Sequence, residues 1–126
     1  KKNFIVVLGG FMSESGWIGV DLDGTLAVYE GWNNGEIGKP VPLMVDRVKN
    51  WISNGVTVKI MTARVGFTSD ENYRDEMIRK IQDWTESHIG VRLEVTATKD
   101  FSMIELWDDR AVQVVPNKGF RVDELR

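Results

Sequence analysis

The sequence predicts one α/β domain with three layers, in which helices cover both faces of a parallel sheet. Short apolar runs alternate along the chain with longer segments of helical periodicity, which is typical of strand-helix-strand units. Several of these runs end in charged or hydroxyl side chains, as expected where parallel strands place their ligands. At 126 residues the chain is long enough for one substantial core and too short for a second.

The composition is that of a soluble globular protein. The formal net charge is −3, so the chain lacks the basic field of many nucleic-acid binders. It contains no cysteine, which excludes a disulfide framework and a thiolate metal site and fits a cytoplasmic location. Residues 1–12 are expected to be an N-terminal extension or tag, because a polar stretch after Met12 favours Met12 as the natural start, and residues 13–126 form the predicted domain. An added edge strand is the alternative for the residues before Met12.

The first predicted strand runs straight into two aspartates. Residues 17–26 read W-I-G-V-D-L-D-G-T-L, with an apolar run before Asp21 and Asp23. Side chains alternate along a strand, so these carboxylates would share a face at its carboxyl end, and Gly24 permits a sharp turn directly afterwards. The motif predicts phosphoryl transfer through an aspartate, and the alternative is an ordinary cap and turn.

Two carboxylates held this close require a compensating cation. Unit charges about 4 Å apart repel by ~4 kcal/mol at an effective dielectric of about 20. Oxygen ligands without thiolates or clustered histidines favour Mg²⁺. A calcium-binding EF-hand loop starting at Asp21 is excluded, because its sixth and twelfth positions would hold Leu26 and Trp32 instead of Gly and Glu.

The next elements are a helix and a second core strand. Apolar residues recur at helical spacing from Val41 to Ile52, with prolines at the entry and Asn54-Gly55 at the exit. An apolar strand over 56–61 then stops at Thr62-Ala63-Arg64. The threonine hydroxyl and the arginine fork are donors suited to a phosphate, although a threonine at a strand end is also a common turn or cap residue.

A second helix is predicted to begin near Thr68 and to last until Gly90. Glu71, three residues after Thr68, suggests a capping box, and apolar side chains follow on one face. His88 lies at the end of this helix and is interpreted as a helix-terminal residue and not as a metal ligand.

Three more strands are predicted near 91–97, over 104–107 and over 111–115. Lys99 precedes the second of them, which ends in Asp108-Asp109-Arg110. An acidic pair at a strand end again invites a cation, although aspartates in a surface turn are the simpler interpretation when taken alone.

The order D-L-D-G-T, apolar-Thr, Lys and Asp-Asp resembles the haloacid dehalogenase superfamily of phosphohydrolases over residues 17–115. The resemblance implies a Rossmannoid α/β/α fold and a Mg²⁺-dependent phosphatase that works through an aspartyl-phosphate. Asp21 would be the nucleophile and Asp23 the general acid and base. Thr62 and Lys99 would contact the phosphate, with Lys99 balancing its charge.

The resemblance also implies a metal site. The carboxylate of Asp21, the backbone carbonyl of Asp23 and the acidic pair Asp108 and Asp109 would hold Mg²⁺, directly or through water. Lys99 departs from the family pattern because only eight residues separate it from Asp108. Other cations can therefore share its role, and the alternative for Lys99 is a solvated surface lysine. These cations are Lys118, Arg64 and Arg110.

The flanking motif residues complete the predicted substrate site, and the chain leaves no room for a cap domain. Only the Gly- and Asn-rich segment 29–39 lies between the first motif and the first helix, and it is predicted to be a small flap. Tyr29 and Trp32 in this flap can stack on a sugar or base, or simply cover the sheet edge. The residues assigned to phosphate and substrate binding beside them are Gly24, Thr25, Ala63, Arg64 and Arg110.

An open site favours a bulky substrate or a partner subunit that closes it, such as a homo-oligomer. The chain resembles more loosely the phosphatase domain of phage-type polynucleotide kinases, through D-x-D-G-T-L-A, Thr-Ala-Arg, the helix over 73–84 and Asp-Asp-Arg, and also short phage and prophage hydrolases of the superfamily. This implies a polynucleotide 3′-phosphate as substrate, with a nucleotide or sugar phosphate as the alternative. A catalytically idle phosphate-binding module and a phosphotransferase are the other classes considered, and no kinase P-loop is present.

Overall fold

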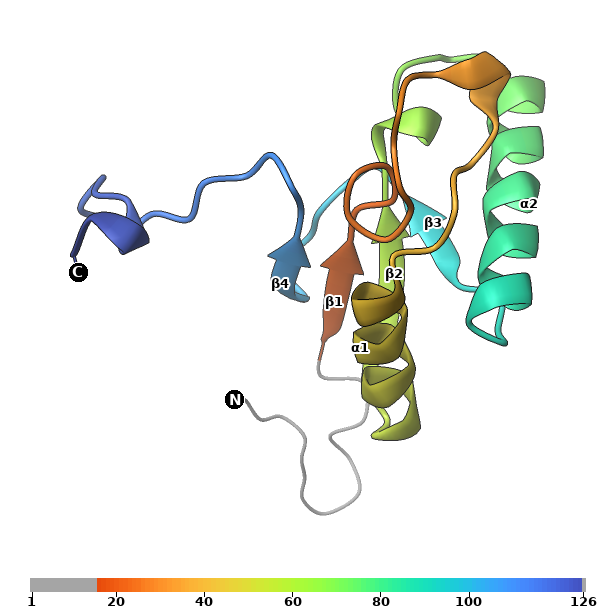
Figure 1. Cartoon of the computed structure of the whole chain (residues 1–126). Coiled ribbons are helices and arrows are strands. Elements are labelled where there is room, and N and C mark those ends of the chain that lie inside the picture. The colour runs from red at the N-terminus through yellow and green to blue at the C-terminus, as the bar shows by residue number, and fades with distance from the viewer. Residues whose placement is uncertain (1–15, 126) are drawn as a thin grey trace.

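A computed structural model describes residues 16–125 and contains a parallel sheet with two long helices (Figure 1). The predicted N-terminal extension, residues 1–12, lies outside the described residues. Three short 3₁₀ segments accompany the main elements, at Asn33–Gly35, Ala63–Val65 and Val122–Leu125. In chain order the main elements are β1 (Trp17–Val20), α1 (Pro42–Ser53), β2 (Thr57–Met61), α2 (Glu71–His88), β3 (Glu94–Thr96) and β4 (Met103–Trp107).

The four strands form one sheet in the order β3-β2-β1-β4, and every neighbouring pair is parallel. The prediction of an α/β fold on a parallel sheet is therefore confirmed. All carboxyl ends point to the same edge, so the segments that follow β1, β2 and β4 meet there.

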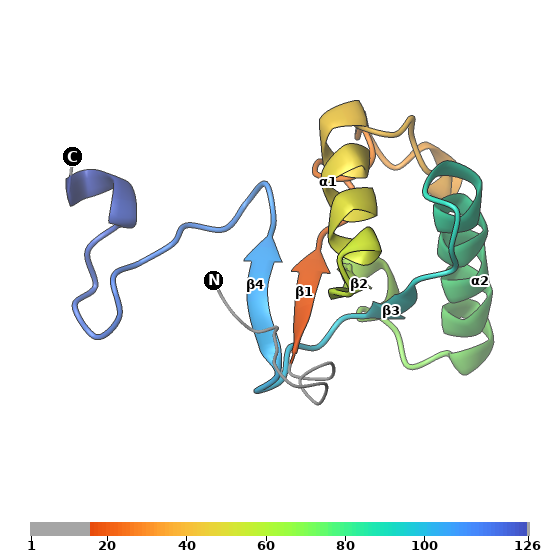
Figure 2. The ribbon, with the colours of Figure 1, turned by 90° about the horizontal axis from the view of Figure 1, so that it is seen from below.

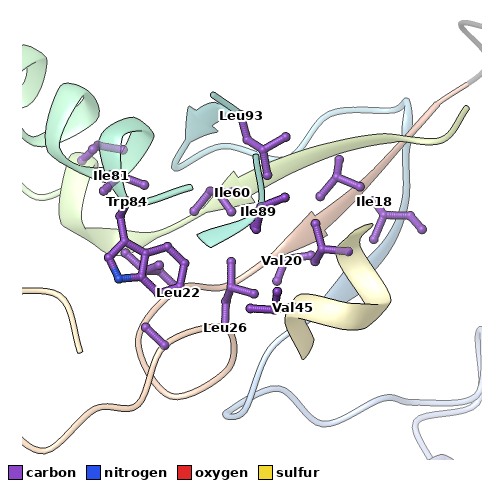
Figure 3. Packing of buried hydrophobic residues seen from close by; sticks show 14 of the residues in the cluster. Ile18, Val20, Leu22, Leu26, Val45, Ile60, Ile81, Trp84, Ile89 and Leu93 are labelled. Carbon is purple, nitrogen blue, oxygen red and sulfur yellow. The ribbon is translucent and has the colours of Figure 1, made fainter. Parts of the chain in front are cut away.

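Both helices pack against one face of the sheet. Ile18, Val20 and Ile60 project to this face from β1 and β2, and they form one buried cluster with side chains of both helices (Figure 3). Two right-handed crossovers in the same direction, from β1 to β2 to β3, place their helices on the same side. The helix residues in the cluster are Val45, Val48, Met77, Ile81 and Trp84.

The predicted third layer is absent among residues 16–125. A helix on the opposite face would have to lie in the crossover from β3 to β4, because that connection passes to the other side of β1. Only residues 97–102 separate these strands, which is too short for a crossover helix. The described fold is thus a sheet with helices on one face.

The helix ends follow the sequence signals at α1 and differ from them at α2. Pro42 stands in the first turn of α1, and Asn54 caps its end, as expected. At α2 the predicted capping box from Thr68 is wrong, because the Asp70 carboxylate accepts the first free N–H groups of the helix and Thr68 only accepts the N–H of Asp70. His88 lies in the last turn of α2, as predicted.

The strand predicted over 111–115 is also wrong. Beyond β4 the chain leaves the sheet and runs away from it, on the side opposite to α2, in both views (Figures 1 and 2). Among residues 108–125, the pairing that the structure describes is an isolated antiparallel bridge between Val114 and Arg121. Among the described residues, neither helix is both long and apolar enough to cross a membrane.

Candidate active site

An acidic triad forms where β1 and β4 end side by side. The N–H of Asp21, the first residue after β1, donates to the carbonyl of Trp107, the last residue of β4, at 2.9 Å. This bond places Asp21 beside Asp108 and Asp109. One carboxylate oxygen from each of the three lies within 4.8 Å of the others, a spacing that a single cation can bridge.

Gly24 and Thr25 position Asp109. The Thr25 hydroxyl donates to Asp109 Oδ1 and accepts the N–H of Asp109, both at 3.0 Å. Gly24 has a φ of +89°, and a Cβ at this position would lie 2.6 Å from Asp109 Oδ2. The sequence assigned both residues to phosphate binding, whereas their contacts here are to the third member of the triad.

The surroundings shift the pKa values of Asp21 and Asp109 in opposite directions. Burial, a hydrogen bond with Asp109 and the charge of Asp108 raise the pKa of Asp21 to about 7. Burial also acts to raise the pKa of Asp109, but hydrogen bonds from Asp21 and Thr25 outweigh it and lower that pKa below its usual range. Oxygen-only donors with this much unbalanced charge fit a hard divalent cation such as Mg²⁺.

Cation binding should therefore stabilise the protein most at high pH. The pKa of Asp21 is about 7 when folded and near 3.8 when unfolded, so the cation-free folded state binds more protons between these values. Its free energy of unfolding falls as pH rises from about 4 to 7, and Mg²⁺ compensates once Asp21 ionises. Thermal melts with Mg²⁺ or EDTA should give a larger Mg²⁺-induced increase in Tm at pH 8 than at pH 5. An equal increase at both pH values would contradict this.

Asp23 is held by a buried arginine. Arg64, which is 4% exposed, donates from Nε to Asp23 Oδ2 at 2.7 Å and from Nη2 to Asp23 Oδ1 at 2.9 Å. This is the bidentate geometry that only arginine can supply. Asp23 therefore faces Arg64 and is not a member of the triad, and Arg64 lies against Asp23 instead of pointing freely into the site.

Thr62 and Ala63 form the turn that carries Arg64 away from β2. The Thr62 hydroxyl accepts the N–H of Arg64 at 3.1 Å and caps the short helix Ala63–Val65. A hydroxyl that accepts one bond still has a proton to donate. Thr62 is buried at the end of β2, so its hydroxyl can serve a ligand at this edge.

Arg64 also contacts the predicted flap, residues 29–39. Arg64 Nη1 donates to the carbonyl of Gly35 at 2.8 Å, and its guanidinium lies 4.8 Å from the ring centre of Trp32. Trp84 of α2 donates from its indole N–H to the carbonyl of Gly38. The segment is thus bonded to the turn after β2 and to α2, while Tyr29 and Trp32 remain about half exposed.

A pocket of about 590 Å³ lies over these groups. Every predicted site residue lines it except Gly24, Thr25 and Lys99, and it also contains Met61, Phe67 and Ala97. Phe67 is 65% exposed and packs edge-on against Tyr73, with ring centres 5.4 Å apart. Phe67 is not among the residues predicted for the site, although a large apolar residue in the loop after Thr-Ala-Arg was the available signal.

Lys99 is exposed in the loop between β3 and β4 and is not a lining residue. Arg110 does line the pocket, and its N–H donates to Asp108 Oδ1 at 2.7 Å. Lys118 lies in the C-terminal segment that leaves the sheet (Figure 1). Among the described residues, Arg64 and Arg110 are the cations that the fold brings to the pocket.

The fold and the site together define an α/β protein with a carboxylate triad at the carboxyl edge of a parallel sheet. No known protein family matches the chain, and no curated protein matches it. A solved structure, that of a conserved protein coded by a locus from Bacteroides thetaiotaomicron, is similar, with a TM-score of 0.53 and 20% identity over 79% of this chain and 80% of that one. At this identity the likeness shows the fold alone.

Proposed function

We propose that this protein is a Mg²⁺-dependent phosphohydrolase that cleaves phosphomonoesters through an aspartyl-phosphate on Asp21, as the resemblance to the haloacid dehalogenase superfamily implies. The observation that carries the proposal is the triad of Asp21, Asp108 and Asp109 within 4.8 Å, beside a separate Asp23 held by Arg64. A turn or cap has no need of this arrangement, because crowded carboxylates cost free energy without a cation.

The first chemical step belongs to Asp21. Its carboxylate oxygen attacks phosphorus, the bond from phosphorus to the leaving oxygen breaks, and an aspartyl-phosphate forms. Asp21 must be ionised to attack, yet its pKa of about 7 leaves it partly protonated at neutral pH. A Mg²⁺ ion held by Asp21, Asp108 and Asp109 would supply the positive charge that keeps Asp21 ionised and offsets the phosphoryl oxygens.

Asp23 supplies the proton transfers. It donates a proton to the leaving oxygen and then accepts one from the water that attacks phosphorus, which returns Asp21 and releases inorganic phosphate. Both oxygens of Asp23 accept a bond from Arg64, and each keeps a second lone pair for the proton that is transferred. Arg64 therefore orients the acid and base, and it is a positioning residue in this proposal.

The pocket favours a substrate with a planar group. Its volume lies within the ordinary range for small ligands, roughly 300–1,000 Å³. Three exposed aromatic side chains line the pocket, and aromatic faces stack on bases of any sequence. A nucleotide or a polynucleotide end is thus favoured over a plain sugar phosphate. These aromatic residues are Tyr29, Trp32 and Phe67.

The test is phosphate release from 3′-phosphorylated oligonucleotides, mononucleotides and sugar phosphates, with Mg²⁺ or with EDTA. We expect release that depends on Mg²⁺ and is fastest on a base-bearing substrate. Absence of release from all of them, by folded protein that binds Mg²⁺, would exclude a general phosphatase and favour the idle phosphate-binding module.

Arg110 and Lys99 can be ranked as phosphate-binding cations. Arg110 lines the pocket and Lys99 does not, so Arg110→Ala should lower the rate of phosphate release by roughly 10- to 100-fold, whereas Lys99→Ala should stay close to wild type. Steady-state rates of both variants check this, with exposed Lys49→Ala on α1 as the matched control. The reverse order would restore Lys99 as the balancing cation.

A further inference from the structure

The C-terminal segment 111–125 is an arm with no place in the described domain. It leaves β4 and extends away from the sheet in both views (Figures 1 and 2). Its apolar side chains are about half exposed, which is unusual for several large residues in one short segment. These residues are Val112, Val114, Phe120 and Val122.

The arm is folded but cannot be stable alone. Val115 N–H donates to the carbonyl of Phe120 and Val122 N–H to the carbonyl of Gln113, so residues 113–115 pair antiparallel with 120–122. A single two-stranded pairing is at best marginally stable in water and needs a further surface. The hydrogen bonds of Gln113 and Val115 point toward residues 120–122. The backbone N–H and carbonyl of Val114 therefore point the opposite way, where another strand can pair with them.

Within the described part of the chain, the sheet has a matching open edge at β4. β4 is the last strand in the sheet order and pairs with β1 alone among residues 16–125. Trp107 turns its carbonyl toward Asp21, so by alternation the backbone groups of Leu106 face outward. Ile104 of β4 is also exposed, at 39%. An unprotected edge with apolar side chains is a template for another strand.

The arm cannot reach the β4 edge of its own chain. Only Asp108, Asp109 and Arg110 connect β4 to the arm, and a parallel return along β4 needs a crossover of about a dozen residues. An antiparallel return would need a tight hairpin at these three residues. They are instead held by Thr25, which bonds Asp109, and by the Asp108 carboxylate, which accepts the N–H of Arg110. The site residues thus direct the chain away from β4.

We propose that the protein forms an arm-exchanged dimer, in which residues 111–115 of each copy add a strand to the β4 edge of the other. The two docking sites are equivalent, so the assembly closes with two-fold symmetry and leaves neither β4 edge open. Phe120 and Val122, which pair with this strand, then cover exposed apolar surface beside β4. A second copy is the occupant because it carries the missing strand and the chain's own connection forbids self-pairing.

Cross-linking distinguishes exchange from self-docking, and the absence of native cysteine makes it specific. A tagged chain with Ile104→Cys is co-expressed with an untagged chain carrying Val114→Cys, and the purified protein is treated with a short bis-maleimide. We expect a tagged-untagged dimer. Moving the first cysteine to Asp75→Cys, on exposed α2 at the far side of the sheet, should remove the product. Cross-linking within one chain of the Ile104→Cys/Val114→Cys double variant would overturn the proposal.

Solution mass provides the second measurement. Light scattering of the full chain should give twice the chain mass of 14.3 kDa, and Val112→Asp/Val114→Asp should give the chain mass with an unchanged far-UV spectrum. Leu43→Asp, which also places an aspartate on an exposed apolar position, but on α1, should remain dimeric. A wild-type monomer, or a dimer that the arm variant leaves intact, would overturn the proposal.

Discussion

Replacing Asp21 by Asn is expected to abolish phosphate release, by a factor of at least roughly 10³. The amide keeps the shape of the side chain but is a far poorer nucleophile, so no aspartyl-phosphate forms. The same substitution removes the carboxyl group whose pKa is raised to about 7 by its burial among acids. Asp21→Asn should therefore stabilise the cation-free protein above pH 7 while removing most of its Mg²⁺ response. Initial rates and thermal melts measure both effects.

Asp46→Asn is the matched control for this substitution. Asp46 is exposed on α1 and is not a member of the triad, and its replacement makes the same loss of charge. It should leave the rate and the Mg²⁺-dependent increase in Tm unchanged. Retention of Mg²⁺-dependent phosphate release by Asp21→Asn would refute an aspartyl-phosphate at this residue. Loss of release with tighter phosphate binding would be consistent with it.

Replacing Arg64 by Ala is expected to lower the free energy of unfolding by about 3–5 kcal/mol, more than any other substitution proposed for this protein. The guanidinium is buried and bonded to both oxygens of Asp23, to the Gly35 carbonyl and, at 3.4 Å, to the Glu36 carbonyl. Its removal leaves these acceptors without their donor. Arg64→Lys should recover only part of the loss, because one ammonium cannot form the planar fork. Urea denaturation measures all three proteins.

Exposed Arg79→Ala on α2 is the control for Arg64→Ala and should change stability little. A double-mutant cycle with Asp23→Ala separates the ion pair from the flap contacts. If the ion pair carries the effect, the double variant should be much more stable than the sum of the single losses implies. An Arg64→Ala variant as stable as wild type would mean that this pair is not formed in solution.

Local patterns in the sequence were sufficient for the four strands of the sheet and for both helices. The apolar run before Asp21 and the run before Thr62 became β1 and β2 because β-branched residues suit a buried parallel strand, and Pro42 and Asn54 set the ends of α1. The motif residues after these strands came together because parallel strands bring their carboxyl ends to one edge. The error at the start of α2 was also local. The Asp70 carboxylate caps this helix, whereas the sequence predicted Thr68 as the cap.

The layers could not be predicted from periodicity. A helix covers the second face of the sheet only if a crossover is long enough to contain one. The connection from β3 to β4, residues 97–102, is too short for a helix. The strand predicted over 111–115 has suitable composition, yet a strand also needs a reachable edge. The three residues after β4 are bound to the site and lead the chain away from it. Pairing therefore depended on chain connection and not on propensity.

The sequence by itself determined the chemistry of the site: which carboxylates, hydroxyls and guanidiniums lie at the strand ends and in what order. Only the tertiary structure decided their partners. It joined Asp21 to Asp108 and Asp109, turned Asp23 to Arg64 and left Lys99 outside the pocket. The physical reason is that residue type and local periodicity are written along the chain, whereas contacts between residues some 40 or 80 positions apart depend on how strands are ordered and registered.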